Sequence, residues 1–135
     1  MQGARLNVLV PTRPLDIDDN ALPSQTTYHA LTDGVLLIRS LLGLTGSALS
    51  SGALGPNAQR TPAQIAARIN FLDRLLDIDD NGTVDAATDG VLVIRYLMGF
   101  RGSELTANAL GACPAARACR TTANGVEAYL DALTP

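Results

Sequence analysis

Apolar residues recur along the chain at steps of three and four, which predicts helices. The clearest helix carries an apolar stripe that consists of Ile65, Ile69, Leu72 and Leu76. A shorter stripe lies near the C-terminus and consists of Val126, Leu130 and Leu133. Pro62 suits the first turn of the longer helix. Because no convincing pair of strands accompanies these stripes, the sequence predicts an all-α fold.

Two further apolar runs predict short helices that are buried on most sides. They read "VLLIRSLL" at 35–42 and "VLVIRYLM" at 91–98. A Thr-Asp pair precedes each run, and such residues favour a helix start because they accept hydrogen bonds from free backbone N–H groups. A glycine follows each run, where a helix commonly ends.

These elements belong to a repeated unit. Residues 31–55 and 87–111 are identical at fifteen of twenty-five positions without a gap, and "LDIDDN" occurs at 15–20 and again at 76–81. The pattern predicts a tandem duplication within one compact domain, with a first unit at 15–75 and a second at 76–135. Each unit contains an acidic segment, a helix, a Gly- and Ser-rich turn and a second helix.

Residues 1–14 have no counterpart in the repeat. The segment "RLNVLV" at 5–10 is β-prone and is followed by two prolines. We expect a short, extended N-terminal arm, which either packs on the helices or docks as a strand onto a neighbouring molecule.

Composition narrows the class of protein. Apolar residues make up 47% of the chain and charged residues 17%, which suits a globular protein with an aliphatic core. The net charge is −3 and the ten Lys and Arg residues are scattered, so no nucleic-acid partner is expected. No apolar run reaches the roughly 18 residues of a membrane span. The first ten residues do not form a signal peptide, so the chain is either cytosolic or begins after a removed export signal.

The second acidic segment has the spacing of an EF-hand calcium loop. Counted from Asp77, position 6 is Gly82, which permits the sharp bend that such a loop needs. The predicted oxygen ligands occupy positions 1, 3, 5, 7, 9 and 13: Asp77, Asp79, Asn81, Thr83, Asp85 and Asp89. A standard loop instead ends with a Glu at position 12. The later and shorter Asp89 therefore predicts a bulged loop or a different angle of approach. The alternative is a solvated turn that only caps a helix.

The first acidic segment repeats the motif less regularly. Ala21 stands at position 6, and five additional residues precede the closing aspartate. His29 takes the place of Asp85, although calcium prefers oxygen ligands. We nevertheless predict a second Ca²⁺ site, with the ligands Asp16, Asp18, Asn20 and Asp33.

A calcium loop that ends in Asp, continues as "DGVLVIRYLMG" and is then duplicated resembles the type I dockerin modules. It is also similar to dockerin-like repeats of large secreted bacterial proteins. The resemblance covers both loops and the helices that follow them, about half of the chain. It implies calcium-dependent folding, an extracellular setting and attachment to another protein, such as a cohesin-like receptor. The matching ligand positions are Asp77, Asp79, Asn81 and Asp89, with Asp16, Asp18, Asn20 and Asp33. The second helix of each unit and the longer loops depart from that family.

Cys113 and Cys119 enclose "PAARA" in a segment that the first unit lacks. We expect a local disulfide, which suits an oxidising compartment. The alternative is two free thiols. A zinc site would need further soft ligands, and His29 is the only histidine.

Catalysis has little support in the sequence, since no nucleophile elbow, phosphate-binding loop or Cys–base pair is present. The sequence therefore favours an extracellular calcium-binding module for protein attachment. The alternative is a self-assembling subunit of an extracellular filament or matrix that uses the N-terminal arm for contacts. A calcium sensor is less favoured, because sensors expose Met-rich grooves and this chain has two Met residues.

Overall fold

The computed structural model describes residues 13–19 and 28–135, and in these ranges the regular elements are helices. No strand occurs within the described ranges, so the all-α prediction is confirmed for them. The predicted N-terminal arm at 1–14 lies outside the described residues except for its last two. In the same described part of the chain, no helix has both the length and the apolar character needed to cross a membrane.

The elements follow the same order in both halves of the chain, except that the 3₁₀ turn η2 has no counterpart after α7. The first half contains the π-helical turn η1 (Ala30–Gly34), α2 (Val35–Leu41), α3 (Gly46–Ser50), α4 (Pro62–Leu72) and the 3₁₀ turn η2 (Asp73–Leu76). The second half contains the π-helical turn η3 (Ala86–Gly90), α5 (Val91–Leu97), α6 (Ser103–Thr106) and α7 (Ala123–Leu133). The predicted Gly- and Ser-rich turns thus contain the short helices α3 and α6, which the sequence pattern did not predict.

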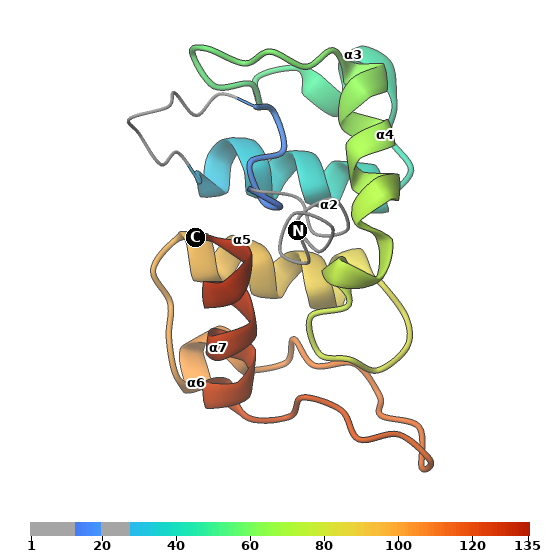
Figure 1. Cartoon of the computed structure of the whole chain (residues 1–135), viewed down its shortest axis with the longest axis vertical. Coiled ribbons are helices and arrows are strands. Elements are labelled where there is room, and N and C mark those ends of the chain that lie inside the picture. Colours follow the sequence, from blue (N-terminus) through green and yellow to red (C-terminus); the bar gives the residue numbers. More distant parts are fainter. Residues whose placement is uncertain (1–12, 20–27) are drawn as a thin grey trace, which may run out of the picture.

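Helices α2 and α5 run in opposite directions at the centre (Figure 1), and each contacts the π-helical turn that begins the other. Two glycines permit their close approach. A Cβ atom on Gly34 would lie 2.9 Å from Cγ1 of Ile94, and one on Gly90 would lie 2.8 Å from Cγ1 of Ile38. The contact is reciprocal, so each half packs its first helical turn against the central helix of the other half.

The aliphatic core forms around this pair of helices. The predicted stripes, one on α4 and η2 and the other on α7, face it. Every stripe residue is buried: Ile65, Ile69, Leu72, Leu76, Val126, Leu130 and Leu133. Ile17 and Ile78, which alternate with acidic residues, are also buried. These two side chains anchor the acidic loops to the core.

The helices begin earlier than the Thr-Asp pairs predicted. The first helical turn starts at Ala30 in one half and at Ala86 in the other, and neither start has a side-chain cap. Asp33 and Asp89 therefore lie inside the first turn, and their carboxylates are free to reach back to the acidic loops. The predicted glycine stops are present, since Gly43 and Gly99 adopt φ values of +89° and +97° just after α2 and α5.

Candidate metal centres

Six aspartates from distant positions form two compact, buried clusters. The first centre consists of Asp16, Asp18 and Asp33, and the second centre consists of Asp77, Asp79 and Asp89. In each centre, one carboxylate oxygen of every residue lies within 4.8 Å of the others. All six residues are at most 4% exposed. The structure thus brings together the first, second and last predicted ligands of each acidic segment.

Alternation along each loop directs two carboxylates to one side. In the second loop the apolar side chain of Ile78 points into the core, so Asp77 and Asp79 point to the opposite side. Asp80 then turns the chain with a φ of +56°, and Gly82 continues the bend at +94°. The first loop turns in the same way at Asp19, whose φ is +57°.

The π-helical turns deliver the third carboxylate of each centre. The N–H of Gly34 donates to the carbonyl of His29 at 3.2 Å, and the N–H of Gly90 donates to that of Asp85 at 3.1 Å. Both bonds span five residues, one more than in an α-helix. The additional residue that places Asp89 at position 13 is therefore accommodated in the helical turn.

Asp89 is held by three backbone donors. Its Oδ1 accepts hydrogen bonds from the N–H of Ile78 at 2.6 Å and of Asp79 at 3.3 Å, and its Oδ2 accepts one from Asp85 at 2.9 Å. These bonds tie the start of the helix to the acidic loop and fix the orientation of the carboxylate.

Asp33 accepts hydrogen bonds from three backbone N–H groups at the corresponding positions of the first half. Oδ1 accepts from the N–H of Ile17 at 2.7 Å and of Asp18 at 3.4 Å, and Oδ2 accepts from the N–H of His29 at 3.0 Å. His29 therefore supports the first centre through its backbone, and the residue itself is exposed.

Two glycines that the sequence analysis did not single out complete the support. The N–H of Gly55 donates to Oδ2 of Asp18, and the N–H of Gly111 donates to Oδ2 of Asp79, both at 2.6 Å. Each glycine ends the "ALG" triplet that both repeats share. That shared triplet, outside any helix stripe, is the signal by which they could have been found.

The remaining predicted ligands of the second loop lie differently. Asn81 is 7% exposed, and its backbone N–H donates to Oδ1 of Asp77 at 3.2 Å. Thr83 and Asp85 are exposed, and Asp85 is not part of the buried carboxylate cluster. Both contribute backbone N–H groups, Thr83 to Oδ1 of Asn81 and Asp85 to Asp89. Asn20 of the first loop lies outside the described residues.

Burial destabilises the ionised form of three aspartates in these centres and so raises their pKa values. It raises the pKa of Asp33 to about 7, with the neighbouring carboxylates of Asp18 and Asp16 contributing further. Burial also raises the pKa of Asp89 to about 6 and raises that of Asp79. Backbone hydrogen bonds oppose these shifts by stabilising the carboxylates. A cation bound among the three carboxylates of a centre would favour their ionised forms.

Within the described residues, a carboxylate oxygen of the first centre has no hydrogen-bond partner. Asp18 is fully buried, and its Oδ1 accepts no hydrogen bond. Because a buried carboxylate oxygen without a partner is destabilising, it calls for a ligand that supplies positive charge. A cation inside the triad would supply it.

Cys113 and Cys119 form the predicted disulfide, which lies beside the second centre.

Comparison of the chain with protein-family models, with curated proteins and with solved structures found no significant match.

Proposed function

We propose that this chain is an EF-hand-like, dockerin-like module of tandem repeats that binds two Ca²⁺ ions. The observation that carries the proposal is the pair of buried aspartate triads, one of which contains the unpartnered Oδ1 of Asp18. Both donor sets consist of oxygen, which suits a hard divalent cation and not a soft metal. Asp16, Asp18 and Asp33 would hold one ion, and Asp77, Asp79 and Asp89 would hold the other.

The ions would have a structural role. In each centre two aspartates come from the acidic loop and the third comes from the helical turn that packs on the opposite half. An ion shared by the three therefore ties the loop to the helix pair at the centre of the molecule. A ligand that binds only the folded state stabilises it, by about 2.7 kcal/mol when its concentration is about 100-fold above Kd.

An extracellular setting fits this role. The disulfide is compatible with an oxidising compartment. Extracellular calcium modules bind with Kd values of roughly 10⁻⁴–10⁻³ M, so they are stably occupied only where calcium is plentiful.

Attachment to another protein is supported by apolar side chains exposed at corresponding positions of both halves. Leu42 and Leu44 follow α2, and Met98 and Phe100 follow α5. Leu42 is 65% exposed and Met98 is 56% exposed, which suits contact with a partner. Light scattering of the calcium-loaded chain separates the two kinds of partner: a monomer favours a receptor, whereas a growing assembly favours the filament alternative.

Removal of calcium tests the proposal. We expect excess EGTA to lower the free energy of unfolding by about 5 kcal/mol relative to saturating calcium, since two ions each contribute about 2.7 kcal/mol. Because that loss is comparable to the whole stability of many domains, helical content measured by circular dichroism should fall. Asp77→Ala should lower the melting temperature in calcium and reduce its shift on chelation. Identical melting curves with calcium and with EGTA would overturn the proposal.

A further inference from the structure

Each acidic loop is covered by a segment that begins at a glycine and ends at an arginine. We call residues 55–60 the first strap and residues 111–120 the second strap. Four residues separate Gly55 from Arg60, whereas eight separate Gly111 from Arg120. The second strap thus covers an equivalent loop with twice as much intervening chain.

The two ends of each strap are fixed to equivalent points. In the first strap Gly55 donates to Oδ2 of Asp18 at 2.6 Å, and Nη1 of Arg60 donates to the carbonyl of Asp16 at 2.8 Å. The backbone N–H groups of Gln59 and Arg60 also donate to the carbonyl of Asp18.

In the second strap Gly111 donates to Oδ2 of Asp79 at 2.6 Å, and the N–H of Arg120 donates to the carbonyl of Asp79 at 2.8 Å. The Nη2 of Arg120 also donates to the carbonyl of Asp77 at 3.2 Å. Both straps therefore hold the backbone and one carboxylate of an acidic loop.

The disulfide removes the excess length of the second strap. It joins Cys113 to Cys119, whose Cα atoms lie 6.0 Å apart, and so closes residues 114–118 into a side loop. The direct path from Gly111 to Arg120 then contains only Ala112 and the two cysteines. With the disulfide in place, the second strap is as short as the first.

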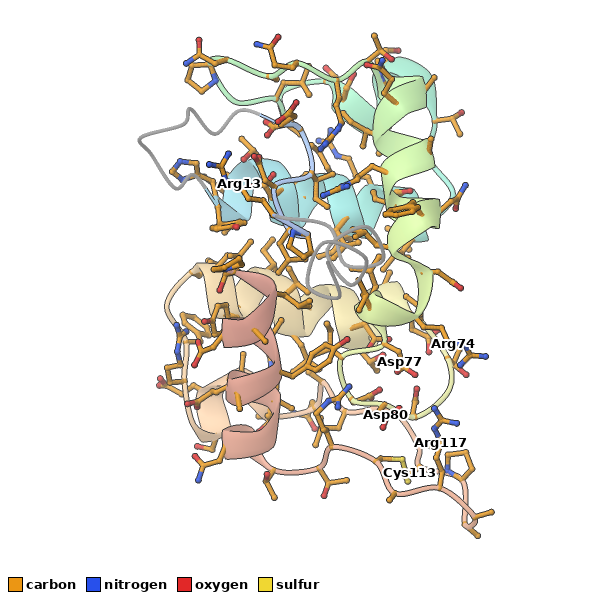
Figure 2. All side chains as sticks on the ribbon, in the orientation of Figure 1. Arg13, Arg74, Asp77, Asp80, Cys113 and Arg117 are labelled. Atoms are coloured by element: carbon orange, nitrogen blue, oxygen red, sulfur yellow. A yellow bond between two sulfur atoms is a disulfide. The ribbon has the colours of Figure 1, made fainter. Side chains whose placement is uncertain are left out.

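The side loop also contacts the acidic loop directly. Nε of Arg117 donates to the carbonyl of Asp80 at 2.8 Å, and Nη2 donates to Oδ1 of Asp80 at 3.0 Å. The same guanidinium lies 4.0 Å from Oδ2 of Asp77, a residue of the second centre. Figure 2 shows Arg117 and Cys113 next to Asp80 and Asp77.

Small movements of the second strap would displace metal-centre residues. Ala112 accepts a hydrogen bond from Nδ2 of Asn81 at 3.3 Å. A Cβ atom on Gly111 would lie 2.1 Å from Nδ2 of Asn81 and 3.1 Å from Oδ2 of Asp79. The second strap is therefore packed closely against Asn81 and Asp79, so a shift of the strap would also shift these two residues.

We propose that the disulfide-closed second strap sets the calcium affinity of the second centre, so that opening the Cys113–Cys119 bond weakens calcium binding there and leaves the first centre unchanged. The proposal rests on the proposed calcium-binding function. Opening the bond lengthens the direct path between Gly111 and Arg120 from three intervening residues to eight, which is more than a doubling. Each doubling of loop length lowers the equilibrium constant for closing the loop by a factor of about three.

Calcium titration of the full chain, followed residue by residue by NMR, tests this inference. The amides of Gly82 and Gly111 report on the second centre, and that of Gly55 reports on the first. The disulfide is opened with dithiothreitol, which becomes its cyclic disulfide while two electrons and two protons pass to the two cysteines. We expect Kd at the second centre to rise at least about threefold, with the first unchanged, and to recover on reoxidation. The double variant Cys113→Ser/Cys119→Ser should match the reduced protein in the absence of reductant.

Each outcome bears on a different claim. An unchanged Kd at the second centre, or an equal loss at both centres, overturns the role of the strap and leaves the calcium-binding function standing. Failure of the oxidised chain to bind calcium at either centre overturns the calcium-binding function and this inference with it.

Discussion

The first and second centres differ in how their loops are closed and agree in what the loops enclose. Both contain three buried aspartates, and both hold the last aspartate by three backbone N–H groups. The first loop has five additional residues before Asp33, and its strap is short. The second loop has Gly82 at the bend, and its longer strap is closed by a disulfide. The two centres share the buried aspartates that would contact the proposed cation. They differ in the segment that closes the loop, which is short in the first half and disulfide-bonded in the second.

Removal of the last aspartate should break one centre at a time and have the largest effect. We expect Asp33→Ala to abolish one calcium equivalent and Asp89→Ala the other, each lowering stability in saturating calcium by about 3 kcal/mol. Isothermal titration calorimetry and thermal melting measure the two effects. A variant that still binds two equivalents with unchanged affinity would show that the triads are not the sites.

Gly111→Ala should distort the second centre alone. The added methyl group would overlap Nδ2 of Asn81 and crowd Oδ2 of Asp79, so we expect calcium affinity there to fall about tenfold or more. Residue-resolved calcium titration by NMR measures this loss, and the first centre should keep its affinity. Gly99→Ala is a matched control, because Gly99 has a positive φ but nothing within 4 Å of its Cβ position. It should cost about 1 kcal/mol of stability through backbone strain alone, with both calcium affinities kept.

The pH dependence of the calcium-free chain should distinguish the centres further. The folded-state pKa values of Asp33, about 7, and Asp89, about 6, exceed the ordinary value of 3.8. Between about pH 4 and these values, the folded state holds protons that the unfolded state has released, so stability falls as pH rises. Denaturant unfolding in EGTA should show this fall, extending to about pH 7. In Asp33→Asn the fall should end near pH 6, and persistence to pH 7 would contradict the assignment.

Asp85→Ala should have the smallest effect. The residue occupies a predicted ligand position, yet it is exposed and supports Asp89 through its backbone N–H, which alanine retains. We expect calcium affinity at the second centre to change by less than about threefold, as measured by calorimetry. A loss as large as that of Asp89→Ala would show that the Asp85 carboxylate is a direct ligand.

The triads are part of the larger ligand sets that the sequence predicted. Alternate residues of a tight loop point to one side, which accounts for two aspartates of each triad, and the repeated closing aspartate accounts for the third. The stripes of α4 and α7 were predicted correctly for a similar reason, since a period of three to four leaves one face to bury. Thr83 and Asp85 occupy predicted ligand positions, but both are exposed. Their spacing fits a ligand position, but whether such a side chain is buried depends on contacts outside the loop.

Other features depend on contacts between distant residues, which a local pattern does not contain. Gly55 and Gly111 support the centres through backbone N–H groups, and the shared "ALG" triplet marks their positions but not this role. Arg39 and Arg95 similarly hold the ends of α3 and α6 by donating to the carbonyls of Leu49 and Leu105. The late position of the closing aspartate predicted a bulged loop or a different angle of approach, whereas the structure has a π-helical turn there.

Diffraction from crystals grown with calcium, with anomalous data that identify the ion, shows directly whether each aspartate triad binds Ca²⁺. We expect one calcium peak inside each triad, with carboxylate oxygens about 2.3–2.6 Å from the ion. Triads that at saturating calcium contain only water, or aspartates hydrogen-bonded to one another as neutral acids, would contradict this expectation.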